Sequence, residues 1–224
     1  MNQKLRSLPI HLHDPWYRFS HLFDECEKAG LAPKNQNVLD LGCAQGFLEK
    51  LLIERWNCTV EGWDYQDYRW KDQLLDQWNF HLHDVAKEWP RREAFDAIFA
   101  LEVIEHMIDT DLFLERCHSF LKPKGKLILS TPNIACLQNR ARLALGKYQY
   151  LMEYRNAIHH VRMYTVPTLL NHLEEKGFKT LLCCGVNLLP IRAHKIAILK
   201  NISVSLANRW PSLCSQVLVI AEPR

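Results

Sequence analysis

The sequence predicts an α/β fold in which helices cover both faces of a doubly wound, mainly parallel sheet. Short apolar runs suited to buried strands alternate with stretches of about 10 to 15 residues whose apolar positions repeat at helical spacing. The chain has 224 residues, of which 48% are hydrophobic and 24% are charged. This size and balance are sufficient for a single hydrophobic core, so we predict one domain, 1–224.

The predicted elements follow one another in a regular order. The strands of the first part of the chain are Asn37–Gly42, Cys58–Asp64, Asn79–Asp84, Phe95–Leu101 and Lys126–Asn133. The helices between them include Phe47–Trp56 and Asp111–Leu121. A third helix and two last strands are predicted at Leu169–Phe178, Thr180–Val186 and Ser215–Glu222. The segments 134–162 and 187–213 interrupt this alternation.

Charge and cysteine content narrow the class of protein. The net charge of +3 is too small to predict nucleic-acid binding by itself. The first residues have no apolar segment typical of a secretion signal, and no run approaches the roughly 18 apolar residues of a membrane span. The eight cysteines form no CxxC pair, and Cys183 and Cys184 fall in an apolar run, so we expect buried reduced thiols. These features favour a cytoplasmic protein.

The turn after the first predicted strand reads DLGCAQG and favours a ligand with positive charge. Gly42, Ala44 and Gly46 are small enough for a tight turn and close ligand approach, provided that Ala44 has a negative φ. Asp40 would repel the pyrophosphate of a dinucleotide. Its carboxylate suits the amino group and sulfonium of S-adenosylmethionine (SAM).

Acids also end the next two predicted strands. Asp64 lies 18 residues after Gly46, where a carboxylate can accept hydrogen bonds from ribose hydroxyls. Asp84 lies 20 residues further on, where it can accept from an adenine amino group. Each acid alone could be a solvated loop residue or a helix N-cap. Three acids at successive strand ends favour a ligand site, because open α/β sheets bind ligands at that edge.

The ordered set VLDLGCAQG, EGWD, HDV, FDAIFALEVIEHM and LKPKGKLILSTPN resembles the class I SAM-dependent methyltransferases. The resemblance covers about 37–178, with a matching last strand at 215–222, and it departs from the family at Ala44, where glycine is usual. It implies a seven-stranded sheet whose last strand is antiparallel. The cofactor residues that it implies are Asp40, Gly42, Cys43, Ala44, Gly46, Phe47, Asp64, Tyr65, Asp84, Val85 and Leu101.

The stretch LEVIEHM places Glu102, Glu105 and His106 at i, i+3 and i+4, on one face of a predicted helix. The simpler interpretation is that the acids favour the helix dipole and the histidine bonds a loop carbonyl. The alternative is a divalent metal site, because oxygen and imidazole donors suit Mg²⁺, Mn²⁺ or Zn²⁺. His106 and His160 are also the candidates for a catalytic base.

A second resemblance supports the metal interpretation. EVIEH, STPN and a histidine five residues before a threonine form a pattern similar to the small-RNA 3′-terminal 2′-O-methyltransferases. It implies a ligand set of Glu102, Glu105, His106 and His160. The substrate elements of the RNA enzymes are not recognisable here. The ubiquinone-pathway O-methyltransferases look related at the glutamate–histidine segment.

Three variable segments are candidates for substrate choice. In the N-terminal segment 1–30, the stretch His11–Gly30 resembles the lid helix of many family members, which implies that Trp16, Tyr17 and Phe19 help to close the pocket. The alternative is that they are ordinary core aromatics. The segment 134–162 is basic and rich in tyrosine. It is predicted to form a cap that holds an anionic or glycosylated acceptor. The alternative is a solvated helical hairpin that packs on the sheet. The segment 187–213 predicts a basic amphipathic helix that packs on its own domain or faces a membrane or lipid-linked substrate.

We therefore predict a SAM-dependent methyltransferase that acts on an oxygen of a small molecule, with nitrogen as the less favoured acceptor atom. One alternative is a metal-dependent RNA ribose 2′-O-methyltransferase, which would show steeply salt-dependent RNA binding. Another is a cofactor-binding partner subunit that has lost catalysis. The sequence does not predict an oligomeric state.

Overall fold

The computed structural model describes residues 15–69, 78–90, 94–147, 160–186, 188 and 206–224, and only the backbone of 15–18. Its centre is a seven-stranded sheet of order β3-β2-β1-β4-β5-β7-β6. The strands are β1 Asn37–Leu41, β2 Thr59–Asp64, β3 Trp78–Leu82, β4 Phe95–Leu101, β5 Leu121–Pro132, β6 Phe178–Val186 and β7 Gln216–Pro223. Strands β1 to β5 pair in parallel, whereas β7 is antiparallel to both β5 and β6. The predicted mixed sheet is confirmed.

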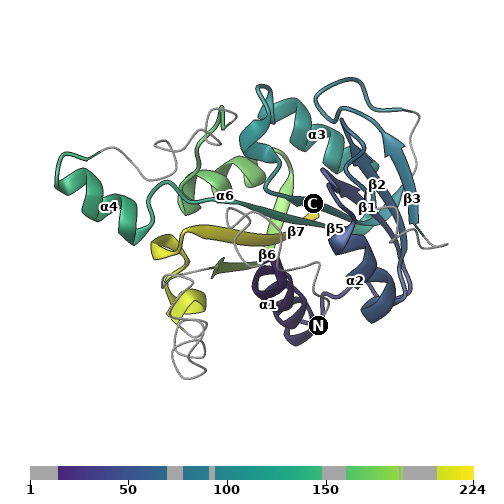
Figure 1. Cartoon of the computed structure of the whole chain (residues 1–224), viewed down its shortest axis with the longest axis horizontal. Coiled ribbons are helices and arrows are strands. Elements are labelled where there is room, and N and C mark those ends of the chain that lie inside the picture. Colours follow the sequence, from purple (N-terminus) through teal and green to yellow (C-terminus); the bar gives the residue numbers. More distant parts are fainter. Residues whose placement is uncertain (1–14, 70–77, 91–93, 148–159, 187, 189–205) are drawn as a thin grey trace.

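Helices lie on both faces of this sheet (Figure 1). Helices α1 (Pro15–Lys28) and α2 (Phe47–Trp56) cover one face, and α3 (Thr110–Phe120) and α6 (Val166–Glu175) cover the other. Helix α4 (Leu137–Ala144) projects from the body. The described residues also form the short 3-10 helices η3 (Ile104–His106) and η6 (Pro211–Leu213). Within the described ranges, no helix combines the length and apolar character needed to cross a bilayer.

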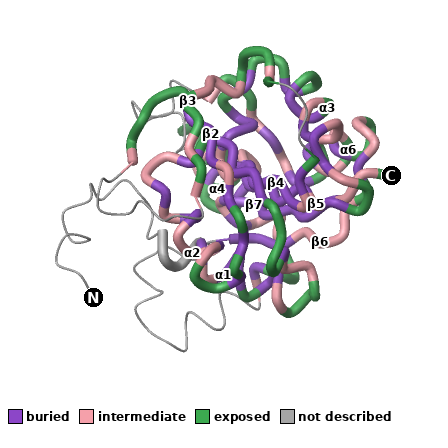
Figure 2. Tube along the Cα trace, turned by 90° about the vertical axis from the view of Figure 1, so that its right-hand side faces the viewer, coloured by how far each residue is buried: buried purple, intermediate pink, exposed green. Residues whose placement is uncertain are grey.

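Two hydrophobic cores sandwich the sheet, and its strands are buried at the centre (Figure 2). Alternation along β5 shows the division, because Leu127 and Leu129 belong to the α3–α6 core and Ile128 belongs to the α1–α2 core. Ser130 therefore emerges at the end of β5 on the α1–α2 side, and Thr131 emerges on the α3–α6 side. This alternation separates the polar groups of the sheet edge into two sets.

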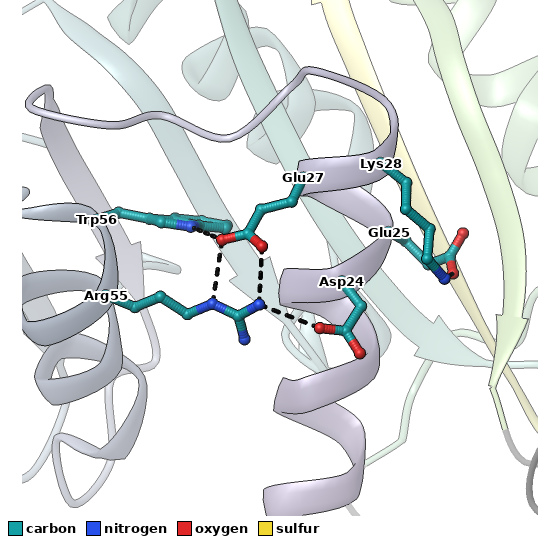
Figure 3. A network of polar contacts seen from close by, with 6 residues as sticks. All are labelled: Asp24, Glu25, Glu27, Lys28, Arg55 and Trp56. Carbon is teal, nitrogen blue, oxygen red and sulfur yellow. Dashed lines mark hydrogen bonds and ion pairs between the residues drawn. The ribbon is translucent and has the colours of Figure 1, made fainter.

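Helix α1 is fixed to α2 by a polar network (Figure 3). Arg55 donates to both carboxylate oxygens of Glu27, at 3.0 and 2.8 Å, and to Asp24 at 3.1 Å. Trp56 Nε1 also donates to Glu27, and the Trp56 ring lies 4.1 Å from that of Phe23. The bonds from Arg55 and Trp56 lower the pKa of Glu27 to about 2. Surface pairs of this kind contribute little energy, but this one sets the position of α1 along the sheet.

Parts of the three variable segments lie outside the described residues. Residues 1–14 of the predicted lid, 148–159 of the predicted cap, and 187 and 189–205 of the predicted basic amphipathic helix are in this group. The described part of 187–213 ends in a helical turn at 206–209 and in η6. Cys184 is buried as predicted, whereas Cys183 is only half-buried, and all eight cysteines are free thiols.

Candidate active site

The loop after β1 is attached to the end of β2. Gly42 has a φ of 74° and donates its N–H to the Trp63 carbonyl at 2.7 Å. Ala44 has a φ of 48°, so the predicted negative φ is wrong. This backbone region costs an alanine about 1 kcal/mol or more, because Cβ crowds the following carbonyl. The Ala44 N–H donates to Asp64 Oδ2 at 2.9 Å, and this bond offsets part of that cost.

The three predicted acids lie along one edge of the sheet. Asp40 and Asp64 are in β1 and β2, and both are buried, at 3% and 5% exposure. Besides Ala44 N–H, Asp64 accepts from the N–H of Gln66 at 3.2 Å. Asp84 follows β3, is half-buried and accepts from the N–H of Ala86 at 3.0 Å. All three acids lie at or just beyond the carboxyl ends of β1, β2 and β3, and their role in binding a cofactor stays a prediction.

The remaining predicted cofactor residues frame the same edge with different exposure. Cys43 is buried, and Gly46 precedes α2 with a φ of 85°. Phe47 begins α2 and is half-buried, as are Val85 and Leu101, the last residue of β4. Tyr65 is exposed, and its hydroxyl lies 2.6 Å from that of Tyr68. An exposed aromatic ring next to Asp64 is a surface on which an adenosine could stack.

The helix predicted after β4 is absent, and Glu102 does not share a face with Glu105 and His106. Glu102 adopts a φ of 60°, and only the short turn η3 follows it. Its carboxylate accepts from Ser130 Oγ at 2.8 Å and from Gln216 Nε2 at 3.0 Å. Both donors lie on the α1–α2 side of the sheet edge. The i, i+3, i+4 argument fails because the chain reverses at Glu102 before the turn begins.

Glu105, His106 and His160 form a compact group on the α3–α6 side. One oxygen or nitrogen atom of each lies within 4.8 Å of the others, and the two imidazole rings are 4.8 Å apart at 70°. Glu105 is buried, and its carboxylate accepts from Thr131 Oγ1 at 3.0 Å. The Glu105 carbonyl accepts from the N–H groups of residues 161 and 162, at 2.8 and 3.1 Å. These backbone bonds bring His160 to His106 across more than 50 residues of sequence.

A recess opens on the α1–α2 side of the edge. It is a narrow crevice with free space of about 10 Å³, room for roughly one water molecule, and is lined by Phe19, Leu22, Leu101, Ser130, Val186, Gln216 and Leu218. The Gln216 amide donates through Nε2 to Glu102, and its buried Oε1 has no hydrogen-bond partner within the described ranges. A carboxylate can only accept, so this geometry fixes the amide with its oxygen as the unused group. An apolar recess with one unused acceptor suits a ligand that carries a hydrogen-bond donor.

Four polar residues of the edge were not predicted from the sequence: Ser130, Thr131, Gln216 and Glu49. Ser130 and Gln216 lie in strand sequences that give no local signal of a role. Glu49 did carry a signal, because it lies on the same face of α2 as the buried Leu52 and Trp56, at i+3 and i+7. It is fully buried, and burial raises its pKa to about 7.

Comparison with known proteins identifies the family. The sequence profile described as "Methyltransferase domain" matches residues 16–182, which is most of the chain. The chain belongs to this methyltransferase family. A ubiquinone biosynthesis O-methyltransferase of Bradyrhizobium diazoefficiens is 32% identical over 142 residues, 58% of this chain and 55% of that protein. The chain thus spans about half the length of the first curated relatives that it matches.

Solved structures agree on the methyltransferase fold. A SAM-dependent methyltransferase from Mesorhizobium loti superposes with a TM-score of 0.63 at 17% identity, covering 91% of this chain and 98% of that one. Phosphoethanolamine N-methyltransferase 2 of Haemonchus contortus, solved with SAM, gives a TM-score of 0.66 at 16% identity, covering 92% and 53%. The two neighbours share their fold with this chain. At these identities the likeness concerns the fold alone.

Proposed function

We propose that this chain binds SAM and transfers its methyl group to a hydroxyl oxygen of a small molecule. Membership of the methyltransferase family and the acids along the sheet edge support the cofactor. One observation carries the choice of oxygen: Glu105, His106 and His160 lie together directly beyond β4. That end of the edge is where the methyl group of a cofactor spread over β1 to β3 would point.

The cofactor would use the polar groups already present at the edge. Asp64 accepts two backbone N–H groups and has further lone pairs for ribose hydroxyls. Asp40 is placed for the ammonium group, and Asp84 for the adenine amino group. SAM carries a net positive charge, which suits an edge lined by carboxylates.

An oxygen nucleophile explains the imidazole pair. Methyl transfer requires in-line approach to the methyl–sulfur bond at about 3 Å in a site that excludes water. A neutral amine brings its own lone pair, but a hydroxyl must lose a proton as it attacks. His106 or His160 can take that proton. The buried Glu105, held by Thr131, can orient the ring that accepts it.

The same three residues fit a divalent ion in donor type. Their oxygen and nitrogen atoms suit Mg²⁺, Mn²⁺ or Zn²⁺. These atoms lie within 4.8 Å of one another, and two ligands of one ion with bonds of about 2.1 Å are at most about 4.2 Å apart, so small side-chain movements would complete the site. Glu102, the fourth ligand implied by resemblance, is engaged by Ser130 and Gln216 on the other side of the edge. Glu105, His106 and His160 would therefore hold such an ion, which would lower the pKa of a hydroxyl bound beside it.

The name of the curated relatives points to the class of acceptor. They are described as ubiquinone biosynthesis O-methyltransferases, which favours an acceptor from the quinone-forming class. The unused Gln216 Oε1 at this edge favours an acceptor that carries a hydrogen-bond donor.

Incubation with SAM and matched acceptors tests the proposal. We expect methylation of catechol or a substituted phenol, detected by mass spectrometry together with S-adenosylhomocysteine (SAH), and no methylation of the corresponding anilines. A parallel arm with a chelator, then added Mg²⁺, Mn²⁺ or Zn²⁺, distinguishes an imidazole base from a metal. Methylation of the anilines alone would overturn the oxygen acceptor, and failure of calorimetry to detect binding of either SAM or SAH would overturn the whole proposal.

A further inference from the structure

Glu49 is a buried carboxyl group directly beneath the predicted cofactor loop. It is the third residue of α2, it is 0% exposed, and its carboxyl group faces the Asp40 carboxyl and the Cys43 thiol, which act on it as hydrogen-bond partners. The side chain rests over Gly62 of β2, where an added Cβ would lie 2.9 Å from Glu49 Oε1 and 2.8 Å from Trp78 Nε1. Glycine at position 62 therefore makes the space that Glu49 occupies.

The groups around Glu49 are mostly acidic. Asp40 from β1, the Cys43 thiol from the loop and Asp64 from β2 all face it. On the β3 side, Arg69 stacks on the Trp78 and Phe80 rings and is paired with Asp67. On α2 itself, Lys50 is directed to Glu54 at the surface. No described cation forms an ion pair with Glu49.

We infer that Glu49 is a specificity-determining residue of the cofactor site, whose buried negative charge favours the sulfonium of SAM over the neutral thioether of SAH. The inference rests on the proposed function. SAM and SAH have almost the same shape and differ by one positive charge. A carboxylate shielded from water behind the loop can separate them by charge without contacting either, because screening inside the protein is weak.

Two features allow Glu49 to change its charge near neutral pH. Burial raises its pKa to about 7, since the charged form loses water, whereas its own backbone N–H and hydrogen bonds from the Asp40 carboxyl and the Cys43 thiol favour the charged form. A positive ligand above the loop would lower this pKa and expel a proton. SAH would expel less, because it lacks the sulfonium charge.

The raised pKa of Glu49 also makes the free energy of unfolding depend on pH. A glutamate whose folded pKa lies above its unfolded value of about 4.5 holds its proton longer in the folded state. The free energy of unfolding therefore falls as the pH rises from about 4.5 to 7, and the cost is complete above that range. Glu49→Gln should raise the melting temperature of the ligand-free protein at pH 8 and change it little at pH 5.

Isothermal titration calorimetry of SAM and SAH at pH 6, 7 and 8 tests the inference in wild type, Glu49→Gln and Glu54→Gln. Glu54 provides the matched control, because it makes the same charge change at the exposed end of the same helix. We expect the preference for SAM over SAH to fall by about fivefold in Glu49→Gln at pH 8 and to be unchanged in Glu54→Gln. At pH 6 wild type and Glu49→Gln should converge, since Glu49 is then largely protonated.

Titration at pH 7 in two buffers of different ionisation enthalpy keeps the inference testable even if Glu49→Gln does not fold. Wild type should release more protons on binding SAM than on binding SAH. Equal proton release, or an unchanged preference in Glu49→Gln at pH 8, would overturn the role of Glu49 and leave the proposed function intact. If wild type binds neither nucleoside, the proposed function fails, and this inference fails with it.

Discussion

The two halves of the carboxyl edge satisfy their acids in different ways. In the first half, formed by the ends of β1, β2 and β3, Asp64 and Asp84 accept backbone N–H groups from the loops beside them. In the second half, formed by the ends of β4, β5 and β7, Glu102 and Glu105 accept from side chains of other strands. The first half is held by local backbone, and the second by a network that exists only once the sheet is assembled.

This difference determines which property of each half changes when a single side chain is replaced. Backbone donors cannot be removed by changing a side chain, so a substitution in the first half removes the acid that holds the ligand and leaves the loop N–H groups to bond with water or the ligand. Removing one donor or acceptor in the second half leaves its buried partner unsatisfied, at a cost of about 1 to 3 kcal/mol. We expect the two halves to separate into effects on cofactor affinity and effects on catalysis or stability.

The largest expected effect is on catalysis in the second half. His160→Ala should lower kcat for the hydroxyl acceptor by about a hundredfold or more, because it removes a proton acceptor or metal ligand. SAM affinity should stay within about twofold of wild type, as measured by calorimetry. His81→Ala, an exposed histidine on β3, serves as the control. Full activity of His160→Ala would show that the histidine pair has no part in the reaction.

The next effect is on affinity in the first half. Asp64→Ala should weaken SAM binding by at least about tenfold, because the ribose loses its acceptor and the Ala44 N–H loses its partner. Asp96→Ala is a comparison at the opposite end of the parallel strands, where the carboxylate pairs with Lys122. Unchanged affinity of Asp64→Ala in a calorimetric titration would contradict the placement of the ribose.

A third substitution measures the network of the second half. Gln216→Leu keeps the volume but removes the donor to Glu102, so it should lower the free energy of unfolding by about 1 to 3 kcal/mol. The exposed Gln36 provides Gln36→Leu as the matched control. Chemical denaturation checks the values. Equal stability of the two variants would mean that Glu102 does not depend on Gln216.

The smallest effect concerns the backbone of the loop. Ala44→Gly should stabilise the protein by about 0.5 to 1 kcal/mol, because glycine accepts a φ of 48° without steric cost. This gain exceeds the larger loss of chain entropy that glycine suffers on folding. Ala141→Gly, at an exposed position of α4, should destabilise by about 1 kcal/mol. A loss of stability in both variants would show that Ala44 is not strained.

The same local and non-local division explains what the sequence could predict. Periodicity placed α2 and β4 at their observed bounds and most other predicted elements to within about three residues, since each depends on neighbouring positions. Strand β5 begins at Leu121 rather than Lys126, and the helix predicted directly after β4 is absent. Asp40, Asp64 and Asp84 could be placed because strand ends fix the edge of a parallel sheet. The positive φ values of Ala44 and Glu102 could not be predicted, because hydrogen bonds from distant strands impose them.

The pairing of Glu102 with Gln216 joins residues 114 positions apart, which no local pattern contains. Helical spacing therefore grouped Glu102 with Glu105 and His106, whereas the positive φ of Glu102 and its bonds to Ser130 and Gln216 direct it to the other side of the edge. Glu49 is an intermediate case. Its place on the buried stripe of α2 could be seen in the sequence, but the acids that surround it come from two separate strands.

The crystal structure of the complex with SAH is the most direct measurement of the central claim. The claim is that the cofactor lies along the carboxyl edge, over the buried acids of β1 and β2. We predict that the ribose hydroxyls lie within hydrogen-bonding distance of the Asp64 carboxylate, with the adenine towards Asp84. A nucleoside bound elsewhere, with Asp64 contacting only the backbone N–H groups of its own loops, would contradict it.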